Sequence, residues 1–338
     1  MRVDGEVCVL DEPALDEAWC RRAFESWVDD AAERERFASE REVDVPVERA
    51  GIGRFRANVF RQAGRFGFVL RHIPREIPAF DELALPEEAL VKLASLRRGL
   101  VLVTGVAGCG KSTTLAAMIG WINRNLRRHV VTIEDPIEFV FEDGTSVINQ
   151  REIGLDTRDF QTGMKHVVRQ SPDVILIGEM RDRETMEAAI HAAETGHLVL
   201  STLHTVNAVQ TVERIINYFP PHQHDLLRLQ LSLVLEGVVS QRLLVRKSGG
   251  GRVPAVELLL ATPTIREILF EGRTRDIPAA LEEGSLYGTQ TFHVSLRRLL
   301  EQGAVALEEA LAASDSPEAL RLELRGITRG VIDREYTI

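Results

Sequence analysis

The chain has few cysteines, no long apolar run and a deficit of basic side chains, and each shortage excludes a class of protein. Cys8, Cys20 and Cys109 lie far apart and form no C-x-x-C pair. Neither a disulfide framework nor a zinc ribbon is therefore predicted, and a reducing cytosol fits best. No stretch reaches the roughly eighteen apolar residues of a membrane span, and the acidic start MRVDGEVCVLDEP has no signal-peptide core. The 41 Lys and Arg face 51 Asp and Glu, and this net charge of −10 disfavours a general nucleic-acid binder.

The length and composition predict a globular protein of two domains. The 338 residues are 44% hydrophobic and 27% charged, and the length exceeds that of a typical single domain. The stretch PREIPAFDELALP at 74–86 carries three prolines and is the linker candidate, with the linker itself placed at residues 76–86. We therefore expect a small α+β domain over residues 1–75 and a larger domain over 87–338.

The first domain is predicted to combine one helix with a small sheet. The helix begins near Pro13, and the charged stretch at 32–42 is interpreted as a solvated helix end rather than a binding patch. Its apolar face comprises Leu15, Trp19, Ala23 and Trp27. Alternating apolar residues predict strands around 43–47, 55–59 and 66–70, the last two joined by a turn at 62–64.

From residue 86 to residue 245 strands alternate with helices, which predicts a parallel sheet covered by helices. The expected strands are 100–104, 129–134, 146–149, 173–178 and 197–202. The expected helices are 112–124, 157–170, 182–195 and 207–217. After these, we expect a helix over 223–240, a hairpin of 242–246 with 253–260, and several short helices over 263–323.

One stretch organises this larger domain. The apolar strand at 100–103 leads into Gly105-x4-Gly110-Lys111-Ser112, and an amphipathic helix follows. Glycines allow backbone N–H groups to converge on phosphate oxygens, while Lys111 supplies a cation and Ser112 a hydroxyl for Mg²⁺. Both the spacing and the strand–loop–helix context predict a nucleotide-binding site.

Two acidic clusters follow predicted strands, where the ligand sites of parallel sheets lie. In the first, Pro136 interrupts the strand after Glu134 and Asp135, so that Glu138 could turn back and align a water molecule. In the second, a buried strand ends in Gly178-Glu179, and Glu179 would organise Mg²⁺. The alternatives are a charged turn for the first cluster and a helix-start charge for Glu179.

Histidines and arginines form the remaining candidates. His197 and His204 bracket a strand, and their spacing does not suit a helical metal pair. His204 lies among hydroxyl residues that could sense a γ-phosphate, whereas a satisfied core histidine is an equal alternative for His197. Five arginines of the first domain lie on or beside two strands: Arg54, Arg56, Arg61, Arg65 and Arg71. They are either surface charge or fingers that reach a neighbouring subunit's triphosphate, worth roughly 10³–10⁵ in rate.

Together these motifs resemble the type II/IV secretion ATPase superfamily, and most closely the type IV pilus retraction ATPases of the PilT/PilU family. The resemblance runs from about Val3 to about Leu324. It is carried by GVAGCGKSTTLAAMI, TIEDPIEFVFE, NQREIG, SPDVILIGEMRDRETMEAAIHAAETGHLVLSTLHT, RIINYFP and TPTIREILFEGR.

The resemblance implies an α/β fold and a role for each matched residue. The fold would be a small N-terminal PAS-like α+β domain, shortened here, followed by a RecA-like P-loop ATPase domain with a helical C-terminal part. The catalytic set would be Glu138, Glu179, His197 and His204, with Arg56 and Arg71 approaching ATP from an adjacent subunit. Mg²⁺ would be held by Ser112 and Glu179. The nucleotide would be bound by Gly105, Gly108, Cys109, Gly110, Lys111, Ser112 and Thr113.

The implied function is an ATP-hydrolysing hexameric motor that powers pilus retraction and twitching motility. Its partner would be the platform protein of the inner membrane, so the motor would be cytoplasmic and peripheral to that membrane's inner face. The stretches RETME and SLYGTQTF lean toward PilU, which leaves open an accessory, weakly active subunit that works with a companion PilT-type motor. A secretion or pilus-extension ATPase is the third alternative. The segment Thr264–Arg273 resembles a family motif associated with retraction, and Cys109 replaces the family's usual serine.

Overall fold

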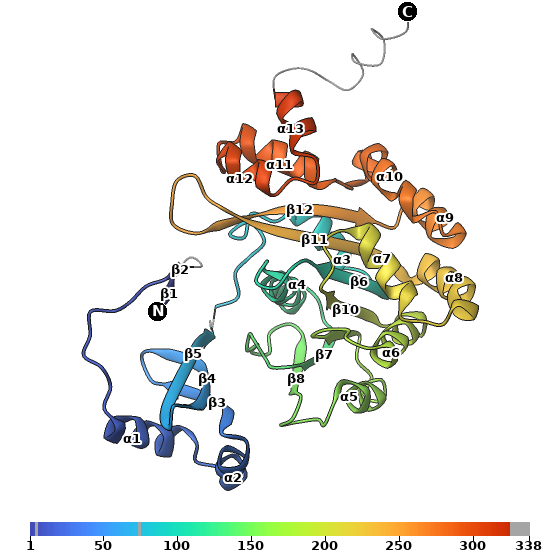
Figure 1. Cartoon of the computed structure of the whole chain (residues 1–338). Coiled ribbons are helices and arrows are strands. Elements are labelled where there is room, and N and C mark those ends of the chain that lie inside the picture. The colour runs from blue at the N-terminus through green and yellow to red at the C-terminus, as the bar shows by residue number, and fades with distance from the viewer. Residues whose placement is uncertain (4–5, 74–75, 325–338) are drawn as a thin grey trace, which may run out of the picture. The chain divides into compact units, whose positions relative to one another are not determined.

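The computed structural model describes residues 1–3, 6–73 and 76–324, which form two compact units (Figure 1). The first unit comprises Met1–Ile77 together with Glu138–Val140, and the second comprises Pro78–Ile137 and the chain from Phe141 onward. The first is a small α+β unit, and the second is an α/β unit with a helical C-terminal part. The predicted fold class is therefore confirmed.

The first unit packs two helices on a three-stranded antiparallel sheet. The strands β3 (Glu42–Arg49), β4 (Gly53–Gln62) and β5 (Arg65–Ile73) pair in chain order. The helices are α1 (Glu17–Trp27) and α2 (Ala31–Glu40), and two-residue strands β1 (Arg2–Val3) and β2 (Glu6–Val7) pair near the chain start. The core of the unit consists of Val28, Phe37, Val43, Val45, Val47, Ala57 and Val59.

The three predicted strands of this unit are confirmed, but two details of its helical part are wrong. Leu15 is not on the helix. The Asp16 side chain accepts a hydrogen bond from the Trp19 N–H at 2.6 Å and caps α1, which therefore begins at Glu17 and not near Pro13. The charged stretch at 32–42 is not the end of that helix. Most of it belongs to the separate helix α2, which Asp30 caps and which buries Phe37. The prediction failed because the stretch is mostly charged and only Phe37 is buried.

The second unit is built on a seven-stranded sheet in the order β12-β11-β6-β10-β9-β7-β8. All neighbouring pairs are parallel except β11 with β12. The strands are β6 (Gly99–Thr104), β7 (His129–Glu134), β8 (Val147–Glu152), β9 (Val174–Ile177), β10 (Leu198–Leu203), β11 (Leu235–Val245) and β12 (Arg252–Leu260). The five predicted parallel strands are confirmed.

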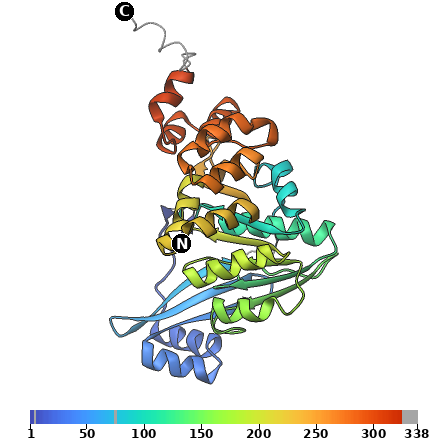
Figure 2. The same cartoon turned by 90° about the vertical axis from the view of Figure 1, so that its right-hand side faces the viewer.

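Helices cover both faces of this sheet (Figure 2). One face packs against α3 (Glu87–Ala94) and α4 (Lys111–Asn125), and the apolar stripe predicted for α4 is buried there. Phe80 and Leu85 from the proline-rich segment join the same core. The opposite face is covered by α5 (Phe160–Val167), α6 (Arg183–Glu194), α7 (Ala208–Asn217), α8 (His224–Val234), α9 (Pro263–Glu271) and α10 (Ile277–Glu283).

The C-terminal helices form a third cluster on the β11–β12 hairpin. Leu244, Val253 and Ala255 of the hairpin pack against α11 (Phe292–Glu301), α12 (Leu307–Ala312) and α13 (Pro317–Leu324). Short 3-10 turns at 221–223, 274–276 and 284–287 connect the last helices. Residues 325–338, which the sequence assigned to the ATPase domain, lie outside the described residues. No helix within the described residues is both long and apolar enough to cross a bilayer.

The helix predicted over 223–240 is wrong in its second half. It ends at Val234, and Leu235 begins β11, which lies beside β6 in parallel. Val238 packs into the core on one face of the sheet and Val239 into the core on the other. A continuous apolar run suits a strand buried on both faces as well as a buried helix, and the run alone does not distinguish them. The predicted hairpin is confirmed with a longer first strand.

Candidate nucleotide-binding site

The candidate site lies at the carboxyl edge of the second unit's sheet. Because β6, β7, β9 and β10 are parallel, their following loops meet at one edge. This edge receives the phosphate loop from β6, Asp135 from β7, Glu179 from β9 and His204 from β10. The fold thus brings together residues that lie up to a hundred positions apart.

The phosphate loop has the backbone that its glycines allow. Gly105, Gly108 and Gly110 have φ values of 144°, 77° and 94°. A Cβ on Gly105 would lie 2.4 Å from the Cys109 sulfur and 2.6 Å from the Gln241 carbonyl oxygen, so this position excludes any side chain. Lys111 opens α4, and its Nζ donates to the carbonyl oxygens of Gly105 and Val106 at 3.0 and 3.1 Å. The ammonium is thereby held within the loop.

Ser112 and Thr113 follow on the first turn of α4, half-buried. Cys109 is almost fully buried, and burial raises the pKa of its thiol although the Lys111 charge acts in the opposite direction. A raised pKa keeps the thiol protonated, so Cys109 packs as a small apolar group and is a poor nucleophile.

Glu179 lies at the centre of the second half of the site. Its side chain is only 19% exposed. Oε1 lies 3.2 Å from Nε2 of His204, and Oε2 accepts a hydrogen bond from Nε of Arg181 at 2.8 Å. Arg181 also lies 3.5 Å from Asp135. The structure therefore pairs two of the predicted catalytic residues, Glu179 and His204, at one edge.

The structure separates the two predicted histidines. His197 precedes β10, and its Nδ1 lies 3.0 Å from the Ala192 carbonyl oxygen. His204 follows the same strand, so its backbone lies roughly 20 Å from that of His197. The two histidines therefore lie at opposite ends of β10, and the catalytic role of His197 stays a prediction.

The remaining predicted residues lie in the first unit. Arg56 and Arg71 are cross-strand partners on β4 and β5, and Arg56 forms a 3.2 Å ion pair with Asp44. Arg71 lies 4.0 Å from Glu138, which the structure groups with this unit. Arg61 stacks 3.8 Å from the centre of the Phe66 ring, a cation–π contact within the first unit. The catalytic roles of Glu138, Arg56 and Arg71 stay predictions.

Sequence reasoning missed several polar residues that support the site. Gln241 of β11 lies behind the phosphate loop, where its amide atoms are 2.9 and 3.1 Å from the Thr114 hydroxyl. Arg252, beside the hairpin turn, donates to the Gly108 carbonyl at 3.4 Å. No local sequence pattern marks either residue as part of the site. Each lies more than a hundred residues from its partner in sequence, and only the order of the strands in the sheet brings it to the loop.

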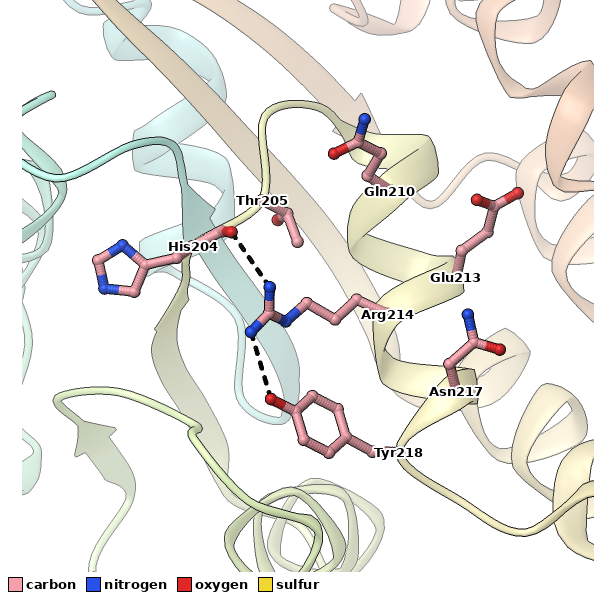
Figure 3. Close-up of a pocket in the computed structure, with 7 residues that line it drawn as sticks. All are labelled: His204, Thr205, Gln210, Glu213, Arg214, Asn217 and Tyr218. Atoms are coloured by element: carbon pink, nitrogen blue, oxygen red, sulfur yellow. Dashed lines mark hydrogen bonds between the residues drawn. The ribbon is translucent and has the colours of Figure 1, made fainter.

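A polar cavity of about 460 Å³ adjoins His204 (Figure 3). Arg214 of α7 points back across it, with Nη1 3.5 Å from the His204 carbonyl oxygen and Nη2 3.3 Å from the Tyr218 hydroxyl. The cavity is lined by His204, Thr205, Gln210, Glu213, Arg214, Asn217 and Tyr218. It lies directly behind the segment that carries the predicted phosphate sensor.

The donor set fits a nucleotide and its cation. The glycine backbone and Lys111 suit phosphate oxygens, and the side chains available for a hard cation are the Ser112 hydroxyl and the Glu179 carboxylate. Among the described residues no group of three or more His, Cys, Asp or Glu could hold a metal by itself.

Comparisons with known proteins agree with this geometry. The family model for "Type II/IV secretion system protein" matches residues 54–282. The chain is 42% identical to the type IV pilus ATPase PilU of Pseudomonas aeruginosa over 96% of this chain and 85% of PilU. It is 40% identical to the retraction ATPase PilT of the same organism, over 94% and 92% of the two chains. A crystal structure of the pilus retraction motor PilT with bound ADP superposes with a TM-score of 0.86 at 44% identity, over 94% of this chain and 90% of that one.

The sequence motifs, the phosphate-loop geometry and these similarities lead to one conclusion. The chain belongs to the type II/IV secretion system protein family, in its PilT/PilU group, and it is a nucleotide-binding ATPase.

Proposed function

We propose that the chain is an ATP-hydrolysing motor for type IV pilus retraction, which works as a ring of six identical subunits. The observation that carries this proposal is the single sheet edge that holds Lys111 together with the Glu179–His204 pair. The similarity to relatives named as pilus retraction ATPases supports it.

Each residue has a defined task in the proposed reaction. The phosphate-loop amides and Lys111 bind the β- and γ-phosphates, and His204 senses the γ-phosphate from the end of β10. Ser112 and Glu179 would hold Mg²⁺, which when bound neutralises charge on the phosphate oxygens. Glu138 aligns the attacking water. Arg56 and Arg71 approach from a neighbouring subunit, where an arginine can be worth roughly 10³–10⁵ in rate.

The proposal includes the place and partners of the motor. Residues 1–75 form the PAS-like domain, 76–86 the linker and 87–338 the ATPase domain. The ring works at the inner face of the cytoplasmic membrane against the pilus platform protein, and the segment Thr264–Arg273 takes part in retraction.

ATP turnover by the purified protein tests the assignment. We expect Lys111→Ala and Glu138→Gln each to lower kcat by roughly a hundredfold or more, since each removes a group that acts in the transition state. Arg158→Ala is the control, because Arg158 is 83% exposed and its ion-pair partner is its neighbour Asp159. Wild-type turnover in both site variants would remove the assignment.

A second candidate is an accessory subunit of the PilU kind. It is favoured by the RETME and SLYGTQTF stretches, and the identities to PilU and PilT, 42% and 40%, do not separate the two roles. Turnover of the chain alone is to be compared with turnover after a PilT-type motor is added. A low rate that rises only with the companion supports the accessory role, and a full rate alone supports the motor.

A further inference from the structure

Arg181 bridges two carboxylates that follow neighbouring strands. Its Nε donates to Oε2 of Glu179 at 2.8 Å, and its Nη1 lies 3.5 Å from Oδ2 of Asp135. Glu179 follows β9 and Asp135 follows β7, and these strands are hydrogen-bonded to each other. The guanidinium thus connects two loops at the edge that holds the nucleotide site.

The Glu179 carboxylate is restrained on both oxygens and along its backbone. His204 contacts Oε1 at 3.2 Å, while Arg181 holds Oε2. The Thr202 hydroxyl donates to the Gly178 carbonyl at 2.7 Å, and the Met180 N–H donates to the Thr202 carbonyl at 3.2 Å. A carboxylate that is held in this way keeps one orientation, which is what organising a cation and its water requires.

The second contact of Arg181 acts on the segment that leads to Glu138. Asp135 is the first residue after β7, and Glu138 follows three positions later, beyond Pro136. Holding Asp135 therefore fixes the start of that segment. The array His204–Glu179–Arg181–Asp135 crosses the carboxyl ends of three strands: β10, β9 and β7.

We propose that Arg181 is a positioning residue for ATP hydrolysis, which orients Glu179 and fixes the start of the Glu138 segment through Asp135. The inference rests on the proposed function for the roles of Glu179 and Glu138. The competing explanation is an ordinary surface ion pair, since the Arg181 side chain is 59% exposed and such pairs contribute little to stability. The two explanations predict different values of kcat for an Arg181 variant, whereas both predict little change in its stability.

Steady-state kinetics of Arg181→Ala and Arg181→Lys in the full chain test the proposal. We expect Arg181→Ala to lower kcat by roughly tenfold to a hundredfold with KM for ATP nearly unchanged, because a misplaced carboxylate harms the transition state more than substrate binding. Arg181→Lys should restore only part of the rate, because an ammonium does not reproduce the fork that reaches two carboxylates. Arg158→Ala is the matched control and should keep the wild-type kcat.

A double-mutant cycle separates positioning from a general loss of charge. If Arg181 acts partly through Asp135, Arg181→Ala should lower kcat by a smaller factor in an Asp135→Asn background than in the wild type, and the loss that remains there comes from Glu179. Multiplicative losses would overturn the part of the proposal that acts through Asp135. An unchanged kcat in Arg181→Ala, or an equal loss in Arg158→Ala, would overturn the whole proposal.

A binding measurement keeps the inference testable even if the chain alone turns over no ATP. The Mg²⁺ concentration that gives half-maximal binding of a fluorescent ATP analogue should rise several-fold in Arg181→Ala and stay unchanged in Arg158→Ala. An unchanged Mg²⁺ requirement in Arg181→Ala would contradict the role, whereas absent turnover in the wild type would contradict only the proposed motor.

Discussion

Glu257 is a mostly buried acid outside the nucleotide site that supports the segment carrying His204. Its Oε1 accepts a hydrogen bond from the Ala208 N–H at 2.8 Å, at the start of α7 and four residues beyond His204. Burial raises its pKa to about 7; the charge of Asp315 acts in the same direction, while the Ala208 hydrogen bond and Arg242 oppose it. One carboxyl thus links β12 to the loop that positions the predicted phosphate sensor.

The raised pKa of Glu257 predicts a pH-dependent stability. A carboxyl whose pKa is higher in the folded than in the unfolded state stabilises the fold when protonated, below about pH 4.5, and this contribution is lost as the pH rises toward about 7. Glu257→Gln keeps an oxygen that can accept from Ala208 and never ionises. We expect the variant to exceed the wild type in unfolding free energy at pH 8 by on the order of 3 kcal/mol, with the gain shrinking toward pH 5.

Urea unfolding of both proteins between pH 5 and pH 8 measures this difference. Exposed Glu283→Gln is the control and should show no such trend. A difference between Glu257→Gln and the wild type that stays constant across the pH range would show that ionisation of Glu257 does not affect stability.

Among the elements, β11 contributes more to the site than its sequence suggests. It places Ser240 within 2.9 Å of the Thr104 hydroxyl at the end of β6, and Gln241 against Thr114 of α4. All four side chains are buried. The strand therefore supports the phosphate loop from both sides, at the end of β6 and at the first turn of α4.

Breaking the Gln241–Thr114 hydrogen bond on one side should lower the unfolding free energy, and replacing both residues should restore most of it. Gln241→Met leaves the buried Thr114 hydroxyl without that partner, which should lower the unfolding free energy by roughly 1–3 kcal/mol. Replacing both residues, with Gln241→Met and Thr114→Val, should recover most of the loss, because no buried polar atom of the pair is then left unpaired. Urea unfolding of the two single variants and the double variant measures the cycle, and a double variant that is no more stable than Gln241→Met would show that the pair is not coupled.

Local sequence patterns predicted those parts of the site in which a strand and the site residues after it are consecutive in sequence. The strand β6, the glycine loop and α4 are consecutive in sequence, and so are β9 with Glu179 and β10 with His204. Gln241, Glu257 and Arg252 could not be predicted as site residues, because sheet order and not sequence distance brings them there. The start of β11 was also predicted as helix, over 223–240, because a continuous apolar run fits a buried strand as well as a buried helix.

At the scale of the whole molecule, the predicted binding and catalytic residues are divided between the two units of the described structure. Lys111, Glu179 and His204 belong to the second unit, whereas Arg56 and Arg71 belong to the first. If these arginines serve a neighbouring subunit, as proposed, no single chain holds a complete site. Lesions in different units should then complement each other in mixed rings.

Mixing Lys111→Ala and Arg71→Ala subunits tests this arrangement. We expect each variant alone to be nearly inactive, and an equal mixture to regain about a quarter of the wild-type rate, because one interface in four joins an intact phosphate loop to an intact arginine. A mixture of Lys111→Ala with Glu179→Gln is the control; both lesions lie on the same side of every interface, so no mixed interface is complete. Equal turnover of the two mixtures would mean that Arg71 does not act at a neighbouring subunit's nucleotide site. ATP hydrolysis would then use the groups of one chain alone.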